Sequence, residues 1–148
     1  MDLGLSGKHC FVTGASAGIG RATALALAAE GAMLSIAGRD ETALAEIRDR
    51  IVAMGSSVLG IVKCDLSGHE GIDTAAKAVA NAGRPVEVLI NNAGAGRPYS
   101  LDSPLPRDEW EDAFNLNFTA ARRLAEAALP GCGRPDGGGS SRSLVLLR

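Results

Sequence analysis

Residues 13–20, "TGASAGIG", decide the fold of this chain. They follow a short apolar run, "KHCFVT" at residues 8–13, that predicts a strand. They precede "GRATALALAAEG" at residues 20–31, where Ala and Leu favour a helix that ends near Gly31. A strand that breaks into closely spaced glycines and continues as a helix is typical of the first unit of an alternating α/β fold.

The rest of the chain repeats this alternation of strand and helix. Strands are predicted at residues 33–38, 57–62 and 86–91, and helices from Asp40 to Gly55, at 70–83, and at 107–129 after Pro104 and Pro106. The expected strands are near-continuous apolar runs, as in sheets covered on both faces. We therefore predict an α/β fold with a doubly wound parallel sheet (Rossmann-type), incomplete, with four to five strands and helices on both faces.

Composition excludes several classes of protein. The chain has 148 residues, 46% of them hydrophobic, and a net charge of −2. This length and apolar content predict a single domain with a real core. Basic and acidic residues are interspersed, which favours neither nucleic acid nor an anionic membrane as partner. A small neutral or anionic ligand fits better.

The cysteines and the N-terminus indicate a compartment. Cys10, Cys64 and Cys132 form no C-x-x-C pair and are odd in number, so we expect neither a metal site nor a disulfide framework. We find no cationic leader with an apolar segment and no run of about 18 apolar residues. We therefore expect no membrane association and a cytoplasmic location.

The glycine turn carries the main signal for a ligand. Gly14, Gly18 and Gly20 stand between the first strand and the first helix. Without side chains, such a turn lets a diphosphate approach the backbone, while the helix N-terminus supplies free N–H groups and a positive dipole end. The glycines alone are also compatible with a turn that serves only close packing of helix on strand.

The end of the second strand indicates which dinucleotide would bind. An NAD site of this type needs an acid for the ribose, and Gly38 stands at that position. Arg39 follows, where a cation meets a 2′-phosphate. NADP (NADPH) is therefore favoured over NAD. The alternative for Arg39 is a solvated charge beside a helix start.

Two further segments follow strands at the edge where open α/β sheets bind ligands. Asp65 follows the third strand and Asn91 to Gly94 follows the fourth. Asp65 is also compatible with an N-cap of the next helix, and Asn91 with a side chain that only satisfies backbone groups.

Together these segments resemble the short-chain dehydrogenase/reductase (SDR) family. The matching residues are "LSGKHCFVTGASAGIG", "AGRD", "CDLS", "VLINNAG" and "DEWEDAFNLNFTAA", which cover roughly residues 3–129. The resemblance implies an oxidoreductase that moves hydride between NADP(H) and an alcohol or carbonyl substrate. It implies that the glycine turn holds the cofactor diphosphate, that Asp65 contacts the adenine, and that the "NNAG" segment lines the adenosine ribose side. The implied cofactor-binding residues are Gly14, Ser16, Gly18, Ile19, Gly20, Arg39, Asp65, Leu66, Asn91, Ala93 and Gly94.

Asn117 lies on the apolar stripe of the long predicted helix, with Trp110, Phe114 and Leu124. A buried amide without partners costs about 1–3 kcal/mol. The family resemblance implies a catalytic role for Asn117, which would help hold a water in a proton relay. The alternative is a structural Asn that kinks or caps within the helix.

The rest of the family's catalytic set does not match. In the family a Tyr passes the proton and a Lys four residues later lowers the pKa of that Tyr. Here Tyr99 is followed by Ser103, and the lysines are Lys8, Lys63 and Lys77. The family's Ser after a fifth strand is not identifiable either. We therefore expect the chain to be inactive as it stands.

The last residues differ in composition from the rest. Residues 131–148, "GCGRPDGGGSSRSLVLLR", are mostly Gly, Arg, Ser and Pro before an apolar end. We expect a dinucleotide-binding domain at 1–130 and an aberrant tail at 131–148, out of frame on a truncated family member. A designed linker is the competing account. Residues 143–147 are a candidate surrogate fifth strand.

Three functions remain open at this point. The first is an NADP-dependent reductase by descent, with 3-oxoacyl or xenobiotic-type carbonyl substrates. The second is a non-catalytic dinucleotide-binding module or remnant. The third is an interaction protein that joins intact relatives, or a second copy of itself, through the long helix at 107–129.

Overall fold

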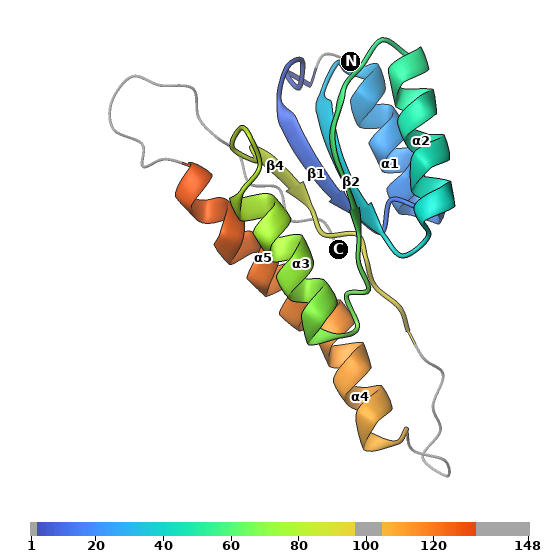
Figure 1. Cartoon of the computed structure of the whole chain (residues 1–148), viewed down its shortest axis with the longest axis vertical. Coiled ribbons are helices and arrows are strands. Elements are labelled where there is room, and N and C mark those ends of the chain that lie inside the picture. Colours follow the sequence, from blue (N-terminus) through green and yellow to red (C-terminus); the bar gives the residue numbers. More distant parts are fainter. Residues whose placement is uncertain (1–2, 97–104, 133–148) are drawn as a thin grey trace.

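The computed structural model describes residues 3–96 and 105–132, in which strands and helices alternate as predicted (Figure 1). The strands are β1 (His9–Thr13), β2 (Met33–Gly38), β3 (Val58–Lys63) and β4 (Val88–Ile90). The helices are α1 (Gly18–Ala29), α2 (Glu41–Ala53), α3 (His69–Ala80), α4 (Arg107–Phe114) and α5 (Ala120–Ala128). A π-helical segment, η1 (Asn115–Thr119), joins α4 to α5, and a 3-10 turn, η2 (Leu129–Cys132), follows α5.

The four strands form one parallel sheet in the order β3-β2-β1-β4. The chain first moves outward from β1 through β2 to β3 and then crosses to β4 on the other side of β1. The strand order therefore reverses between β1 and β4, at a switch point of the kind where α/β sheets bind ligands. The predicted fold class, a doubly wound parallel sheet, is confirmed.

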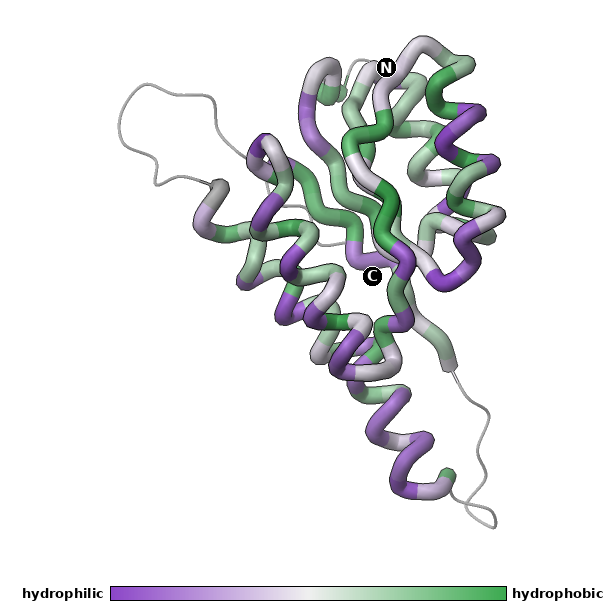
Figure 2. The backbone as a smooth tube through the Cα atoms, in the orientation of Figure 1, coloured by the Kyte–Doolittle hydropathy of each residue, from purple (hydrophilic) through white to green (hydrophobic). Residues whose placement is uncertain are grey.

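Helices cover both faces of the sheet, and each face has its own core (Figure 1). On one face, Val12 and Ile36 pack with Leu44 and Ile47 of α2. On the other, Phe11 and Leu89 pack with residues of α3 and α5. Figure 2 shows mainly apolar residues along the central strands and a mixture of polar and apolar residues along the helices. Leu44, Ile47 and Ile51 of α2 are fully buried, whereas Met54, which follows at the same helical spacing, is 48% exposed.

β3 departs from the predicted pattern. β1 and β4 are buried at every residue, as expected for strands covered on both faces. β3 alternates instead, with Leu59 46% and Ile61 37% exposed. β3 and β4 are both edge strands, so the edge position alone does not explain the difference; β3 is covered on one face and partly open to solvent on the other.

The single long helix predicted at 107–129 is divided in the structure. The π-helical segment Asn115–Thr119 interrupts it, and the backbone hydrogen bonds there join residues five apart instead of four. Leu124 of α5 is fully buried, whereas Trp110 and Phe114 of α4 are 50% and 59% exposed. The predicted apolar stripe therefore packs against the protein only in its C-terminal half.

Some sequence predictions lie outside the described residues. These are the candidate strand at 143–147, most of the tail at 131–148, and Tyr99. Within residues 3–96 and 105–132, no helix is both long enough and apolar enough to cross a membrane.

Candidate functional site

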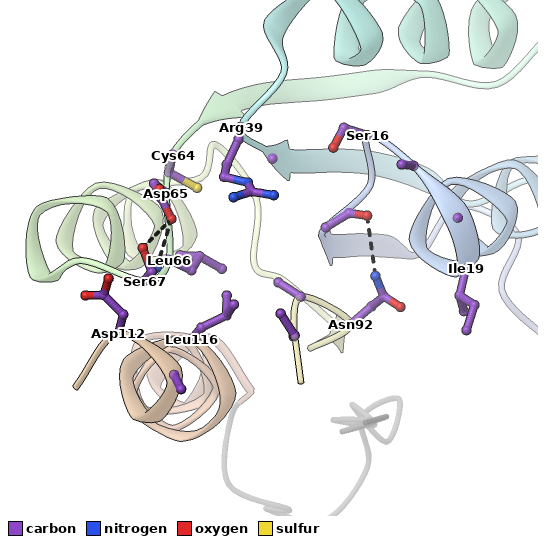
Figure 3. A pocket seen from close by; sticks show the side chains of 18 residues that line it. Ser16, Ile19, Arg39, Cys64, Asp65, Leu66, Ser67, Asn92, Asp112 and Leu116 are labelled. Atoms are coloured by element: carbon purple, nitrogen blue, oxygen red, sulfur yellow. Dashed lines mark hydrogen bonds between the residues drawn. The ribbon is translucent and has the colours of Figure 1, made fainter. Parts of the chain in front are cut away.

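A cleft of about 590 Å³ lies at the carboxyl ends of the strands (Figure 3). Its walls come from the glycine turn after β1, the segments that follow β2, β3 and β4, and the junction of α4 with η1. Most of the predicted cofactor-binding residues line it: Gly14, Ser16, Gly18, Ile19, Arg39, Asp65, Leu66, Ala93 and Gly94. The fold thus brings together residues that are up to 80 positions apart (14 to 94) in the sequence.

The glycine turn needs glycine for two different reasons. Gly14 and Gly18 have φ values of +65° and +53°, which side chains disfavour. Gly20 allows a close contact, since a Cβ atom there would lie 2.2 Å from the carbonyl oxygen of Gly14. Gly20 does not line the cleft. Its lack of a side chain instead allows α1 to pack closely against the turn.

The N-terminus of α1 opens onto the cleft. Its N-cap residue, Ala17, makes no side-chain cap, and the first turn of the helix contains no acid. The first N–H groups of a helix have no partner within the helix, so they can donate to an anion. Ile19 lies beside them and is 78% exposed. The arrangement has the free donors and the space that a phosphate group requires.

The loop after β4 is tied to the glycine turn by Asn92 and Thr13. The Asn92 amide donates to the Thr13 carbonyl oxygen at 3.1 Å, and the Ala93 N–H donates to the Thr13 hydroxyl at 3.0 Å. That hydroxyl donates to the Ile90 carbonyl oxygen at 3.3 Å. Thr13 and Asn92 both belong to segments that the sequence marks as ligand-binding, but neither residue was predicted to make these contacts.

Asn91 points away from the cleft. It is 7% exposed, does not line the cleft, and donates to the carbonyl oxygen of Ala121 on α5 at 3.4 Å. This placement favours the alternative for Asn91, a side chain that satisfies a backbone group. Adjacent residues of an extended segment point to opposite sides, which explains why Asn92 faces the glycine turn instead.

At the end of β2, Gly38 stands where an NAD site has an acid, and Ser16 packs closely against it. A Cβ atom on Gly38 would lie 3.0 Å from the Ser16 Oγ. A side chain at this position would require the Ser16 hydroxyl to shift by a few tenths of an ångström. Arg39, the next residue, points into the cleft between Ser16 and Asp65 (Figure 3). Its guanidinium is suited to hold a phosphate.

Asp65 is fixed in a turn at the end of β3. Its Oδ1 accepts hydrogen bonds from the Ser67 N–H at 3.0 Å and the Ser67 hydroxyl at 2.8 Å. These two bonds, with a smaller effect of the Arg39 charge, lower the pKa of the Asp65 carboxyl. Gly68 is the N-cap of α3, so the N-cap alternative for Asp65 is wrong. Leu66 is 5% exposed and gives this end of the cleft an apolar wall.

Cys64 lines the same end of the cleft but is not activated. Burial raises the pKa of its thiol to about 11, and the nearby Asp65 charge acts in the same direction. The thiol is therefore protonated at neutral pH and acts as a small apolar group. In the ranges 3–96 and 105–132, no group of three or more His, Cys, Asp or Glu side chains could hold a metal ion.

Asn117 holds the π-helical segment in place. Its amide nitrogen donates to the Ala113 carbonyl oxygen at 2.8 Å and to the Ala95 carbonyl oxygen at 2.9 Å. The second bond ties the helix to the loop after β4. The Asn117 amide therefore bonds to backbone carbonyl oxygens both within the helix and in the loop after β4, which favours the structural alternative. A role of Asn117 in a proton relay stays a prediction.

These features together fit an adenine dinucleotide phosphate. The free N–H groups of α1 suit a diphosphate, Arg39 suits a further phosphate, and the wall at Asp65 and Leu66 suits a flat base with an amino group. Three glycines that line the cleft, Gly14, Gly38 and Gly94, stand where a Cβ atom would contact neighbouring groups within 3.0 Å.

Comparison with known proteins shows which family has this sequence and this cleft. Residues 8–139 match the short chain dehydrogenase family. The chain is 30% identical over 138 residues to the 7alpha-hydroxysteroid dehydrogenase of Escherichia coli K12, covering 93% of this chain and 52% of that protein. It is 33% identical over 126 residues to the rhamnolipids biosynthesis 3-oxoacyl-[acyl-carrier-protein] reductase of Pseudomonas aeruginosa, covering 85% of this chain and 48% of that protein.

Solved structures agree with this comparison. L-sorbose reductase from Gluconobacter frateurii, complexed with NADPH and L-sorbose, has a TM-score of 0.80 and 34% identity, over 88% of this chain and 49% of that one. A short chain dehydrogenase from Burkholderia cenocepacia in complex with NADP has a TM-score of 0.78 and 33% identity, over 88% and 53% of the two chains.

The chain spans about half the length of these relatives. Its four-stranded sheet is accordingly incomplete beside theirs, while the glycine turn, the cleft and the switch point are all present. The match covers the glycine turn and the "NNAG" segment alike. This chain belongs to the short-chain dehydrogenase family.

Proposed function

We propose that this chain binds NADP(H) in the cleft at the carboxyl ends of β1, β2 and β3. The observation that carries the proposal is the pairing of two anion-binding features in one cleft, the uncapped N-terminus of α1 and Arg39 beside Gly38. NADPH and NADP in the complexes of L-sorbose reductase and the Burkholderia dehydrogenase support it.

Each part of the cleft has a role in this proposal. The N–H groups from Gly18 to Gly20 hold the diphosphate, and the Arg39 guanidinium holds the 2′-phosphate. The Asp65 carboxylate accepts from the adenine amino group; it is ionised at neutral pH, and the hydrogen bonds from the Ser67 N–H and hydroxyl lower its pKa further. NADP is preferred over NAD because Gly38 provides no acid for a free ribose 2′-hydroxyl.

We further propose that these 148 residues bind the cofactor without turnover. Bound NADP(H) supplies or accepts a hydride at its nicotinamide. The acceptor carbonyl also needs a proton, which the family resemblance assigns to a Tyr with a Lys four residues later. The sequence contains no such pair, since Tyr99 is its one tyrosine and is followed by Ser103. A carbonyl or alcohol substrate is therefore proposed only for the intact family enzyme. Separately, we propose that the chain is located in the cytoplasm.

Association through the helix at 107–129 is a second candidate function. Phe114 and Phe118 stand on α4 and η1 with ring centroids 5.0 Å apart, 59% and 52% exposed. Such a surface is suited to a second copy of the chain or an intact relative. Size-exclusion chromatography with light scattering, on the wild type and a Phe114→Glu/Phe118→Glu variant, tests it.

A fluorescence titration tests the proposed cofactor binding. NADPH is added to the purified chain, and binding is followed by the nucleotide emission and by quenching of Trp110, the one tryptophan. We expect saturable binding of NADPH, weaker binding of NADH, and no NADPH consumption with a panel of ketones and aldehydes. Absence of saturable binding would contradict the proposal, and turnover would contradict its non-catalytic part.

A further inference from the structure

A second cavity of about 540 Å³ adjoins the cleft at the ends of β2 and β3. The two share Arg39, Cys64, Asp65 and Ser67. Among the described residues that line either cavity, the cationic side chains are Arg39 and Lys63. Lys63 lines only the second cavity, beside the cleft proposed to hold the cofactor.

The sheet places Lys63 next to the position that decides cofactor preference. In the parallel pairing of β2 with β3, Lys63 is the register partner of Gly38. The pairing continues past the strand end, where the Cys64 N–H donates to the Gly38 carbonyl oxygen at 2.9 Å. Neighbouring strands lie about 4.8 Å apart, so the backbone of Lys63 is beside that of Gly38.

The side chain of Lys63 makes one weak ionic contact here. Its Nζ lies 3.3 Å from the Glu41 Oε2 in the first turn of α2, and the two side chains are 64% and 71% exposed. Ion pairs this exposed contribute about 0–1 kcal/mol. The flexible stem of Lys63 can therefore change partner at little cost.

The charges around the end of β2 favour a second cation beside a phosphate bound there. Asp40 and Glu41 follow Arg39 directly, and Asp65 lies across the cavity. A phosphomonoester carries a charge of about −1.5 to −2 at neutral pH. Arg39 alone neutralises only part of it, in a region that is otherwise acidic.

We propose that Lys63 is a second specificity-determining residue for NADP(H), and that its ammonium turns from Glu41 to the cofactor 2′-phosphate. The inference rests on the proposed function, since it assumes that the cofactor occupies the cleft with its 2′-phosphate near Arg39. It adds a cation from β3 to the one that follows β2. It also assigns Glu41 a role as a competitor for Lys63.

The first test compares dissociation constants for NADPH and NADH in the wild type and in Lys63→Gln. We expect NADPH to bind about fivefold more weakly in the variant. NADH, which lacks the 2′-phosphate, should bind as in the wild type. Lys77→Gln is the matched control, because Lys77 is an exposed lysine in the last turn of α3 and lines neither cavity.

Glu41→Gln separates direct contact with the phosphate from simple neutralisation of Glu41. We expect Glu41→Gln to tighten NADPH binding, since it removes an acid and frees Lys63. In the Glu41→Gln background, Lys63→Gln should still weaken NADPH binding by at least as much as in the wild type. If its effect disappears there, Lys63 serves only to neutralise Glu41, and the proposed contact is overturned.

The NADPH and NADH affinities of the wild type, Arg39→Asp and Lys63→Gln together show whether only the role of Lys63 fails or the proposed cofactor binding fails as well. If the wild type prefers NADPH, Arg39→Asp removes that preference and Lys63→Gln leaves the NADPH to NADH ratio unchanged, only the role of Lys63 is overturned. If the wild type binds neither nucleotide, both fall together. A selective loss of NADPH affinity in Lys63→Gln, absent in Lys77→Gln, supports the inference.

Discussion

The side-chain amide of Asn92, in the loop after β4, donates a hydrogen bond to the carbonyl oxygen of Thr13 at the end of β1, with a distance of 3.1 Å. A second, longer contact at 3.4 Å reaches the Gly14 carbonyl oxygen. One amide thus connects the two strand ends that flank the switch point. The shape of the phosphate-binding turn depends on a residue almost 80 positions away (13 to 92) in the sequence.

Asn92→Asp tests this connection, because a carboxylate has nearly the shape of the amide and cannot donate. It would face the carbonyl oxygens of Thr13 and Gly14. We expect the free energy of unfolding in urea to fall by about 1–3 kcal/mol and NADPH and NADH to lose affinity equally. An unchanged urea midpoint together with unchanged affinity would contradict the role given to Asn92.

Gly20→Ala tests the close packing of α1 on the glycine turn. In an exposed helix, Gly→Ala usually stabilises by about 1 kcal/mol. Here the new Cβ would lie 2.2 Å from the Gly14 carbonyl oxygen, so we expect a destabilisation of about 1–3 kcal/mol instead. Gly68→Ala is the control, because a Cβ there meets nothing within 4 Å and φ is −113°. Equal unfolding curves for the two variants would argue against this packing.

Arg39→Asp tests the preference for NADP. The substitution places a carboxylate near the ribose and removes the guanidinium expected to hold the 2′-phosphate. We expect NADPH to bind roughly tenfold or more weakly and NADH to bind more tightly. Arg50→Asp, at an exposed position in the last turn of α2, makes the same change in net charge away from the cleft. The assignment of Arg39 would fail if both variants kept the wild-type ratio of affinities.

The buried imidazole of His9 predicts that stability depends on pH. Its Nε2 lies 2.9 Å from the Ser35 Oγ and its Nδ1 lies 3.1 Å from the Arg84 carbonyl oxygen. Burial lowers its pKa below 6.5, although the backbone carbonyl of Arg84 favours the cation. The unfolded chain therefore takes up a proton below pH 6.5 that the folded chain resists, and stability falls as the pH drops from 6.5 toward the folded pKa.

Urea unfolding between about pH 5.5 and 8 measures this effect. For the wild type we expect the contribution of His9 to vanish well above pH 6.5 and stability to fall as the pH drops through 6.5, with a slope of at most about 1.4 kcal/mol per pH unit from this residue. His9→Gln should lose this slope, whatever its absolute stability. His69→Gln, at an exposed position at the start of α3, should keep it. A slope that survives in His9→Gln would assign the pH dependence to another group.

The order of elements and most of the cleft could be predicted from the sequence, because both depend on local patterns. The glycine turn, Arg39 and Asp65 each follow a strand immediately. In a parallel sheet the carboxyl ends of the strands meet at one edge, so residues there converge whatever the details of packing. That is why residues chosen from separate segments line one cleft in the structure.

The two asparagines after β4 could not be assigned from the sequence. Asn91 and Asn92 are chemically identical neighbours, and an extended backbone sends one to each side. Which of them meets the glycine turn depends on the register of β4 against β1, with Val12 opposite Ile90. Register is a property of the folded sheet, and a shift by one residue would exchange the two roles.

The π-helical segment also escaped prediction. The spacing of apolar residues from Trp110 to Leu124 is compatible with one continuous helix. Residues Asn115–Thr119 form the π-helical segment, and the Asn117 amide bonds both to Ala113 within the helix and to Ala95 outside it. The second contact is tertiary. Helical periodicity likewise could not show that Phe114 would stay exposed, since it carries no information on what packs against the stripe.

Backbone NMR of the ¹⁵N-labelled chain titrated with NADPH tests the central claim most directly, because it locates the ligand as well as detecting it. We predict saturable shifts that are largest for the amides of Gly18, Ile19 and Gly20 and for Asp65 to Ser67, with the C-terminal turns of α2 and α3 unaffected. No saturable shift, or shifts centred away from the cleft, would contradict the account.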